Sequence, residues 1–176
     1  MTRNFVIKAV GLATAALWPP TAAPSFGLNV PVAARVISFV QPTPVGIIPV
    51  AIVYQPGNSS SEAEAAGMEK VLANGMRIGR ASLRTRRVPV SSLDQLGGMK
   101  AAFITGNLRS YQDDVAAAAT SQSILTITSD TSCVTAGRCV VGITSASRTQ
   151  IIVSKAAARR NGIRFGSAFL MLVKEI

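Results

Sequence analysis

The sequence contains no histidine and only eight acidic residues among its 176 residues. Histidine is the side chain that most readily exchanges protons near neutral pH, so the commonest general acid or base of enzymes is missing. The four aspartates lie in unrelated segments except for Asp113 and Asp114. Neighbouring residues on a helix point about 100° apart, so these two do not form a catalytic pair by spacing. We therefore predict a protein that is not an enzyme, with no metal and no cofactor.

Long hydrophobic runs are also missing, since no segment reaches the roughly 20 apolar residues of a transmembrane helix. Near the start, Arg3 and Lys8 precede a short apolar run over 9–18, followed by prolines and small residues. This order is typical of a cleaved signal peptide, which we place at residues 1–25. The cleavage site is Ala23-Pro24-Ser25 or Ser25-Phe26-Gly27. We predict a periplasmic protein; an uncleaved membrane-surface anchor is the alternative.

Cysteine is scarce, and its two copies, Cys133 and Cys139, are separated by the short stretch Val-Thr-Ala-Gly-Arg. A close cysteine pair in an exported protein is more often a disulfide than a metal site or a nucleophile. No histidine is present to share a metal. We predict a disulfide that fixes the shape of one hairpin, with free buried thiols or a redox-active pair as alternatives.

Positive charge is in excess, at +10 for the whole chain and +8 once Arg3 and Lys8 are removed. An exported protein rarely meets nucleic acid, so we predict no nucleic-acid partner and favour anionic membrane, cell wall or an acidic protein. The densest cluster comprises Arg84, Arg86 and Arg87. On a strand the first two would share one face and Arg87 would lie on the other. An edge strand protected by charge is the simpler interpretation, and a contact site for an acidic partner is the alternative.

Apolar segments with strand and helix patterns alternate along the chain, without repeats or linkers. This order predicts an α/β fold: a single three-layer domain over 30–176, with a mainly parallel sheet, an antiparallel edge meander and a C-terminal apolar helix. Strands are expected at 47–54, 83–90, 101–105, 124–128, 139–144 and 149–153. Helices are expected at 32–40, 61–74, 110–119, 155–161 and 167–176, with a short helical turn at 91–96. Glu62 and Glu64 support the helix start at Ser61.

The expected last helix, 167–176, has almost no polar face. A helix that is apolar all round is either buried on several sides or docked on another chain. Burial against the sheet is our prediction, and a homodimer or partner interface is the alternative.

Polar residues follow three of the expected parallel strands, where ligands of open α/β sheets bind. They are Gly57, Asn58, Ser59 and Ser60 after the first strand, Gly106 and Asn107 after the third, and Asp130 after the fourth. The first group precedes a helix start, whose backbone N–H groups favour an anion. These residues predict a small-molecule or anion receptor similar to one lobe of a solute-binding protein. Ordinary turns are the alternative.

The C-terminal third carries a longer pattern. It consists of Ile124-Leu125-Thr126-Ile127, a loop with Gly137, the strand end Gln150-Ile151-Ile152-Val153, the segment 154–167 and an apolar end. This pattern resembles the YfiR-type family of small bacterial periplasmic proteins. Ala156-Ala157 and Gly162 match the family, whereas Ser154 stands where the family has asparagine. The opening segment departs further, with 38–42 in place of a Trp-Pro ending.

The resemblance implies an exported α/β domain without catalysis. Characterised relatives repress a membrane-bound diguanylate cyclase by contact in the periplasm, so the expected partner is a membrane-bound signalling protein such as a diguanylate cyclase or a sensor kinase. Relatives also place a disulfide at the hairpin near the end of the sheet, in agreement with Cys133 and Cys139.

Overall fold

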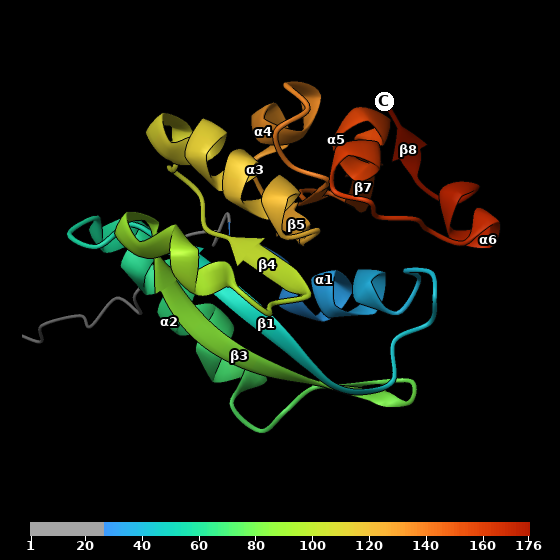
Figure 1. Ribbon diagram of the computed structural model, residues 1–176, viewed down its shortest axis with the longest axis horizontal. Helices are drawn as coiled ribbons and strands as arrows, with labels where there is room; N and C mark the ends of the chain where they lie inside the picture. Colours follow the sequence, from blue (N-terminus) through green and yellow to red (C-terminus); the bar gives the residue numbers. More distant parts are fainter. Residues whose placement is uncertain (1–26) are drawn as a thin grey trace, which may run out of the picture.

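One sheet of eight strands forms the centre of the molecule, in the order β2-β3-β1-β4-β5-β6-β7-β8 (Figure 1). The computed structural model describes residues 27–176, and the expected signal peptide lies outside them. The strands are β1 Gly46–Tyr54, β2 Arg77–Ile78, β3 Ala81–Pro89, β4 Ala101–Ile104, β5 Leu125–Thr128, β6 Val141–Ser145, β7 Thr149–Val153 and β8 Lys174–Glu175. Neighbours from β3 to β6 are all parallel. The predicted fold class is therefore confirmed.

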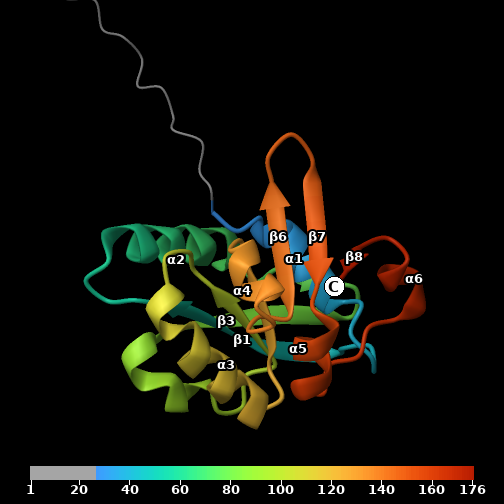
Figure 2. The same ribbon diagram turned by 90° about the horizontal axis from the view of Figure 1, so that it is seen from above.

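Helices cover both faces of this sheet, so that α2 and α3 lie on opposite sides of β1 and β3 (Figure 2). One buried cluster contains side chains from α1 and α2, and a second contains side chains from η1, α3 and α4. The helical segments are α1 Val30–Ile37, α2 Ser59–Leu72, η1 Val90–Leu96, η2 Arg109–Tyr111, α3 Gln112–Ser121, α4 Thr131–Thr135, α5 Lys155–Arg160 and α6 Ser167–Leu170. Because both faces of the central strands are covered, β1 is an apolar run rather than an alternating one.

The polar caps explain why several helices begin where they do. Asn29 caps α1 and Asn58 caps α2, each accepting a hydrogen bond from a backbone N–H in the first turn. Thus α2 begins at Ser59, two residues before the predicted Ser61. The helix predicted from Ser110 begins instead at Gln112, after the short turn η2. Neither α4 nor the short strand β2 was predicted from the sequence.

The predicted helix over 167–176 is wrong beyond Leu170. A turn containing Met171 and Leu172 follows, with relative exposures of 80% and 82%, and the chain then forms β8 parallel to β7. Because β8 lies outside β7, the antiparallel β6–β7 pair is one strand in from the edge.

Hydrogen bonding explains this extended ending. The Ile176 N–H donates to the Val153 carbonyl at 3.0 Å, and the Ile176 carbonyl accepts from the Lys155 N–H at 2.9 Å. A helix here would leave these groups on β7 and α5 without partners. Phe169 supplies the buried contact of the segment, stacking on Phe39 with ring centroids 4.8 Å apart. Of the C-terminal apolar side chains, Phe169 is therefore buried, whereas Met171 and Leu172 are exposed on the turn.

Candidate functional site

A groove of about 720 Å³ lies between α2 and residues 27–31, next to the carboxyl ends of β1 and β4. The chain leaves β1 towards β3 on one side, and β4 lies on the other side, so this is the switch point where open α/β sheets form a crevice. Apolar side chains, among them Val30, Met68 and Val71, form most of the wall. Ser60, Glu64 and Asn107 supply polar groups.

A buried network of hydroxyl groups fastens α2 to this end of the sheet. The Thr105 hydroxyl donates to the Val53 carbonyl at 3.1 Å, so its oxygen accepts from the Ser61 hydroxyl 2.6 Å away. The Ser61 oxygen in turn accepts from the Gln55 N–H at 2.9 Å. The network ties the first turn of α2 to β1 and to the segment after β4, and thereby fixes the polar side of the groove.

Glutamate side chains accept hydrogen bonds from backbone N–H groups around the predicted rim, including that of Gly57 in the segment predicted to favour an anion. Glu64 accepts from the Gly106 N–H at 2.6 Å and from the Leu28 N–H at 3.0 Å. Glu62 accepts from the Gly57 N–H at 3.0 Å. An external anion would therefore compete with two carboxylates of this chain. With Glu64 in its wall, the groove offers an apolar surface and hydrogen-bond acceptors to a ligand.

The structure brings only some of the predicted rim residues together. Ser60, Gly106 and Asn107 line the groove, and the Asn107 amide donates to the Ser60 hydroxyl at 3.3 Å. Gly57 forms a tight turn with φ of +77°, and Ser59 is the first residue of α2. Ser61, Thr105 and Glu64 were missed as parts of this site. The available signal was an acidic residue in the second turn of a helix that follows a buried strand.

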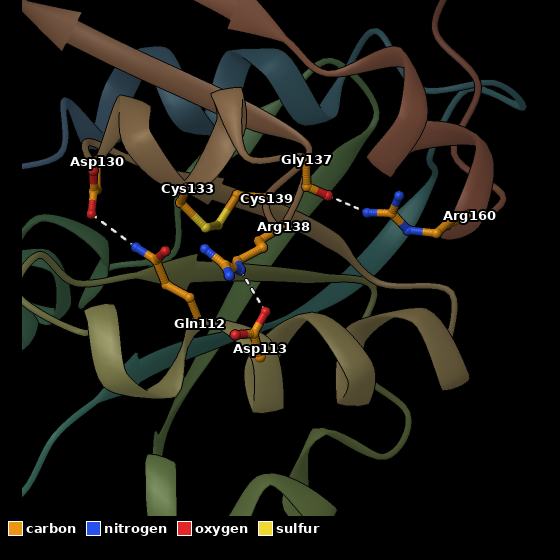
Figure 3. Close-up of polar contacts among 8 residues, drawn as sticks. All are labelled: Gln112, Asp113, Asp130, Cys133, Gly137, Arg138, Cys139 and Arg160. Atoms are coloured by element: carbon orange, nitrogen blue, oxygen red, sulfur yellow. Dashed lines mark hydrogen bonds and ion pairs between the residues drawn. A yellow bond between two sulfur atoms is a disulfide. The ribbon is translucent and has the colours of Figure 1, made fainter.

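Asp130 lies apart from the groove and organises α4 instead. One carboxylate oxygen accepts from the Ser132 N–H and the other from the Gln112 side chain, both at 2.9 Å. These bonds cap α4 and join it to α3 (Figure 3). Asp130 is therefore a structural residue of a second region.

The disulfide joins Cys133 of α4 to Cys139, just before β6, with their Cα atoms 5.3 Å apart. The predicted pairing is present, but its predicted place is wrong. The bond closes the crossover from β5 to β6, whereas the hairpin is the turn between β6 and β7. Both sulfur-bearing side chains are buried in the core under α3 and α4.

The loop that the disulfide closes is held from both sides (Figure 3). Arg138 pairs with Asp113 of α3 at 2.5 Å, and the Arg160 guanidinium of α5 donates to the Gly137 carbonyl. The loop is thus closed by the disulfide and makes polar contacts with α3 and α5. These contacts fix the position of the loop relative to α3 and α5.

In the described part of the chain, no three histidine, cysteine, aspartate or glutamate side chains gather where they could hold a metal. Within residues 27–176, no helix is both long and apolar enough to cross a membrane.

Comparison with known families identifies the chain. A model of the YfiR/HmsC-like family matches residues 57–174, which is about two thirds of the sequence. The chain belongs to the YfiR/HmsC-like family. This YfiR/HmsC-like segment begins just before α2 and reaches the first residue of β8, so it contains Ser61 and Thr105 of the hydroxyl network and the disulfide.

Solved structures show the same fold. A conserved domain protein of Vibrio cholerae is similar with a TM-score of 0.60 and 14% identity, covering 86% of this chain and 60% of that one. An ABC domain from Streptococcus pneumoniae, in complex with L-Trp, gives 0.58 and 12%, covering 83% and 59%. A ligand-free, open substrate-binding protein with adhesive properties from Clostridium difficile gives 0.58 and 9%, covering 84% and 58%.

The YfiR/HmsC-like chain therefore spans about three fifths of the length of these three proteins. At these identities the likeness concerns the fold alone. The search of curated proteins found no significant match.

Proposed function

We propose that this YfiR/HmsC-like protein is exported to the periplasm and acts there without catalysis, by contact with a membrane-bound signalling protein such as a diguanylate cyclase. The observation that carries the proposal is the family match over residues 57–174. The buried Cys133–Cys139 disulfide supports it, because such bonds persist in oxidising compartments.

Two features of the surface suit a protein partner. The loop closed by the disulfide is tied to α3 and α5, so little conformational entropy would be lost when it meets another surface. Met171 and Leu172 expose their apolar side chains on the turn before β8. These two neighbouring side chains could pack against the apolar surface of a partner.

Measuring cyclic di-GMP in the producing bacterium tests the proposal. Deleting the gene should raise the cyclic di-GMP level if the protein represses a diguanylate cyclase, and restoring the full sequence should lower it again. A version that lacks residues 1–25 should remain in the cytoplasm and fail to restore the low level. An unchanged level after deletion contradicts a cyclase target, and rescue by the truncated version contradicts action in the periplasm.

A small-molecule receptor is the second candidate, and the groove of about 720 Å³ at the sheet's switch point favours it. A panel of metabolites with apolar bodies and hydrogen-bond donors should contain a compound that raises the melting temperature of the protein. Glu64→Gln should weaken that stabilisation. Without any stabilising compound the receptor hypothesis fails.

A further inference from the structure

No strand runs beside the outer side of β3 over most of its length (Figure 1). On its inner side β1 pairs with all nine residues of β3. On its outer side β2 pairs only with Ala81 and Ser82. No strand within residues 27–176 covers the outer side from Arg84 to Pro89. An uncovered edge of this kind is a place where another chain can add a strand.

The direction of the free backbone groups follows from one hydrogen bond. The Leu83 N–H donates outward, to the Met76 carbonyl at 3.0 Å. Successive residues of a strand point their backbone groups to alternate sides, so Thr85 and Arg87 also point outward. Neither backbone N–H has a hydrogen-bond partner in the described part of the chain. Two N–H groups and two carbonyls are therefore available along this edge.

The side chains on this edge are strongly basic. Arg84 and Arg86 are exposed and share one face, as predicted from their spacing. Arg86 donates to the Gln95 carbonyl, while Arg87 on the other face pairs with Glu69 at 2.6 Å and lies over Tyr54. Arg84 forms no ion pair with any described carboxylate.

Charge determines which chain can use the edge. A second copy of β3 would bring arginines opposite arginines, and like charges across a strand pair are destabilising. An acidic strand would place carboxylates two residues apart against Arg84 and Arg86. The arginines therefore disfavour pairing of β3 with a second copy of itself. A strand of opposite charge can still reach the outward backbone groups of Thr85 and Arg87.

We propose that β3 accepts an extended acidic segment of a partner protein as an additional strand. Main-chain hydrogen bonds to Thr85 and Arg87 would supply the pairing, and Arg84 and Arg86 would select the acidic sequence. This proposal deepens the proposed function and rests on it for the kind of partner, a protein. It differs from that function in naming the surface, so the two can fail separately.

Amide hydrogen exchange with a model peptide tests the pairing directly. The probe is acetyl-(Glu-Val)4-amide added to the purified protein, and acetyl-(Lys-Val)4-amide is the control. At ten times its dissociation constant, the acidic peptide should slow exchange of the Thr85 and Arg87 amides about tenfold. The Arg84 and Arg86 amides point towards β1 and should not change. Binding without protection of Thr85 and Arg87 overturns the added strand.

Matched variants separate the backbone contribution from the charge. Thr85→Pro removes one outward N–H while leaving the hydrogen bonds to β1, and proline is tolerated at such edge positions. It should weaken acidic-peptide binding about tenfold, whereas Thr85→Val should not. Replacing both Arg84 and Arg86 with glutamate should reverse the preference towards the basic peptide. Unchanged preference in that variant refutes the role of the arginines.

Other polyanions serve as competing outcomes. Vesicles containing phosphatidylglycerol, or a DNA duplex, that bind more tightly than the acidic peptide without protecting Thr85 would contradict the proposal. If the acidic peptide slows exchange of the Thr85 and Arg87 amides but the deletion strain has an unchanged cyclic di-GMP level, strand addition at β3 is supported and the cyclase target is rejected. Altered cyclic di-GMP without peptide binding would retain regulation and reject this surface.

Discussion

Two crossover helices, α2 and α4, are attached to this sheet by different interactions. α2 follows β1 and α4 follows β5, and each begins with a side-chain cap directly after a parallel strand, Asn58 in one and Asp130 in the other. The hydrogen bond between Ser61 and Thr105 holds the first helix to the sheet, whereas a disulfide holds the second.

Helix length accounts for the difference. α2 has 14 residues and buries Ala65, Met68 and Leu72, so its packing contributes much of its stability. α4 has five residues, too few to form a stable helix alone. It packs so closely on β6 that a methyl group on Gly142 would lie 3.0 Å from Val134. The covalent bond keeps in place a short helix that buries only Cys133 and Val134.

Breaking the disulfide should have the largest effect. Reduction, or the double change Cys133→Ala and Cys139→Ala, should lower the free energy of unfolding by about 2 kcal/mol, because the ring is short. For a chain of this size the melting temperature should fall by about 4 to 8 °C. Thermal unfolding with and without a reducing agent measures this, and the double variant is the control because reductant should not affect it. A wild-type melting temperature that reductant leaves unchanged contradicts the stapling role.

Ser61→Ala tests the non-covalent crossover. It leaves the part-buried Gln55 N–H without its acceptor and should lower the free energy of unfolding by about 1.5 kcal/mol in chemical denaturation. Thr105→Val removes the other hydroxyl. The double variant should lose less than the sum of the single losses, since the two side chains bond to each other. Strictly additive losses would show that the network does not act as a unit.

Removing the cap of α2 should have a smaller effect. Asn58→Ala should lower the free energy of unfolding by about 1 kcal/mol, because the Ser61 N–H loses its acceptor. Asn58→Asp keeps an acceptor at the same position and should stay close to wild type. Equal losses in both variants would point to the Asn58–Gln55 contact instead of the cap.

Glu64→Gln should give the smallest change in stability, about 0.5 kcal/mol, because an amide oxygen can replace only one of the two carboxylate acceptors. Its clearer effect should be local, with faster exchange of the Gly106 and Leu28 amides. Glu62→Gln is the matched control and should affect Gly57 alone. If the Gly106 and Leu28 amides exchange at the wild-type rate, Glu64 does not join Leu28 to Gly106 in solution.

Local patterns predicted much of the fold. The apolar run of β1 and the turn residues after it were sufficient to place a buried strand followed by a helix, since both signals lie within a few residues. Part of the rim was also predicted, because residues after parallel strands meet at one edge of a sheet. Ser60, Gly106 and Asn107 do meet there. Asp130 does not line the groove, since its carboxylate bonds to Gln112 and caps α4.

The partners of polar groups could not be predicted in the same way. Glu64 looks in the sequence like a favourable charge near a helix start, yet its acceptors serve Leu28 and Gly106, 36 and 42 residues away. The residues around Glu64 give no indication of these distant partners. The same holds for the free edge of β3, which depends on how far β2 extends along it.

By itself the sequence determined the α/β class, the mainly parallel direction of the strands, the shared face of Arg84 and Arg86, and the cysteine pair, because periodicity and spacing act locally. Only the tertiary structure decided that the disulfide closes a crossover, that the last residues form β8, and that glutamates occupy the rim donors. The physical reason is that buried backbone groups must find hydrogen-bond partners, and those partners lie far away in the chain.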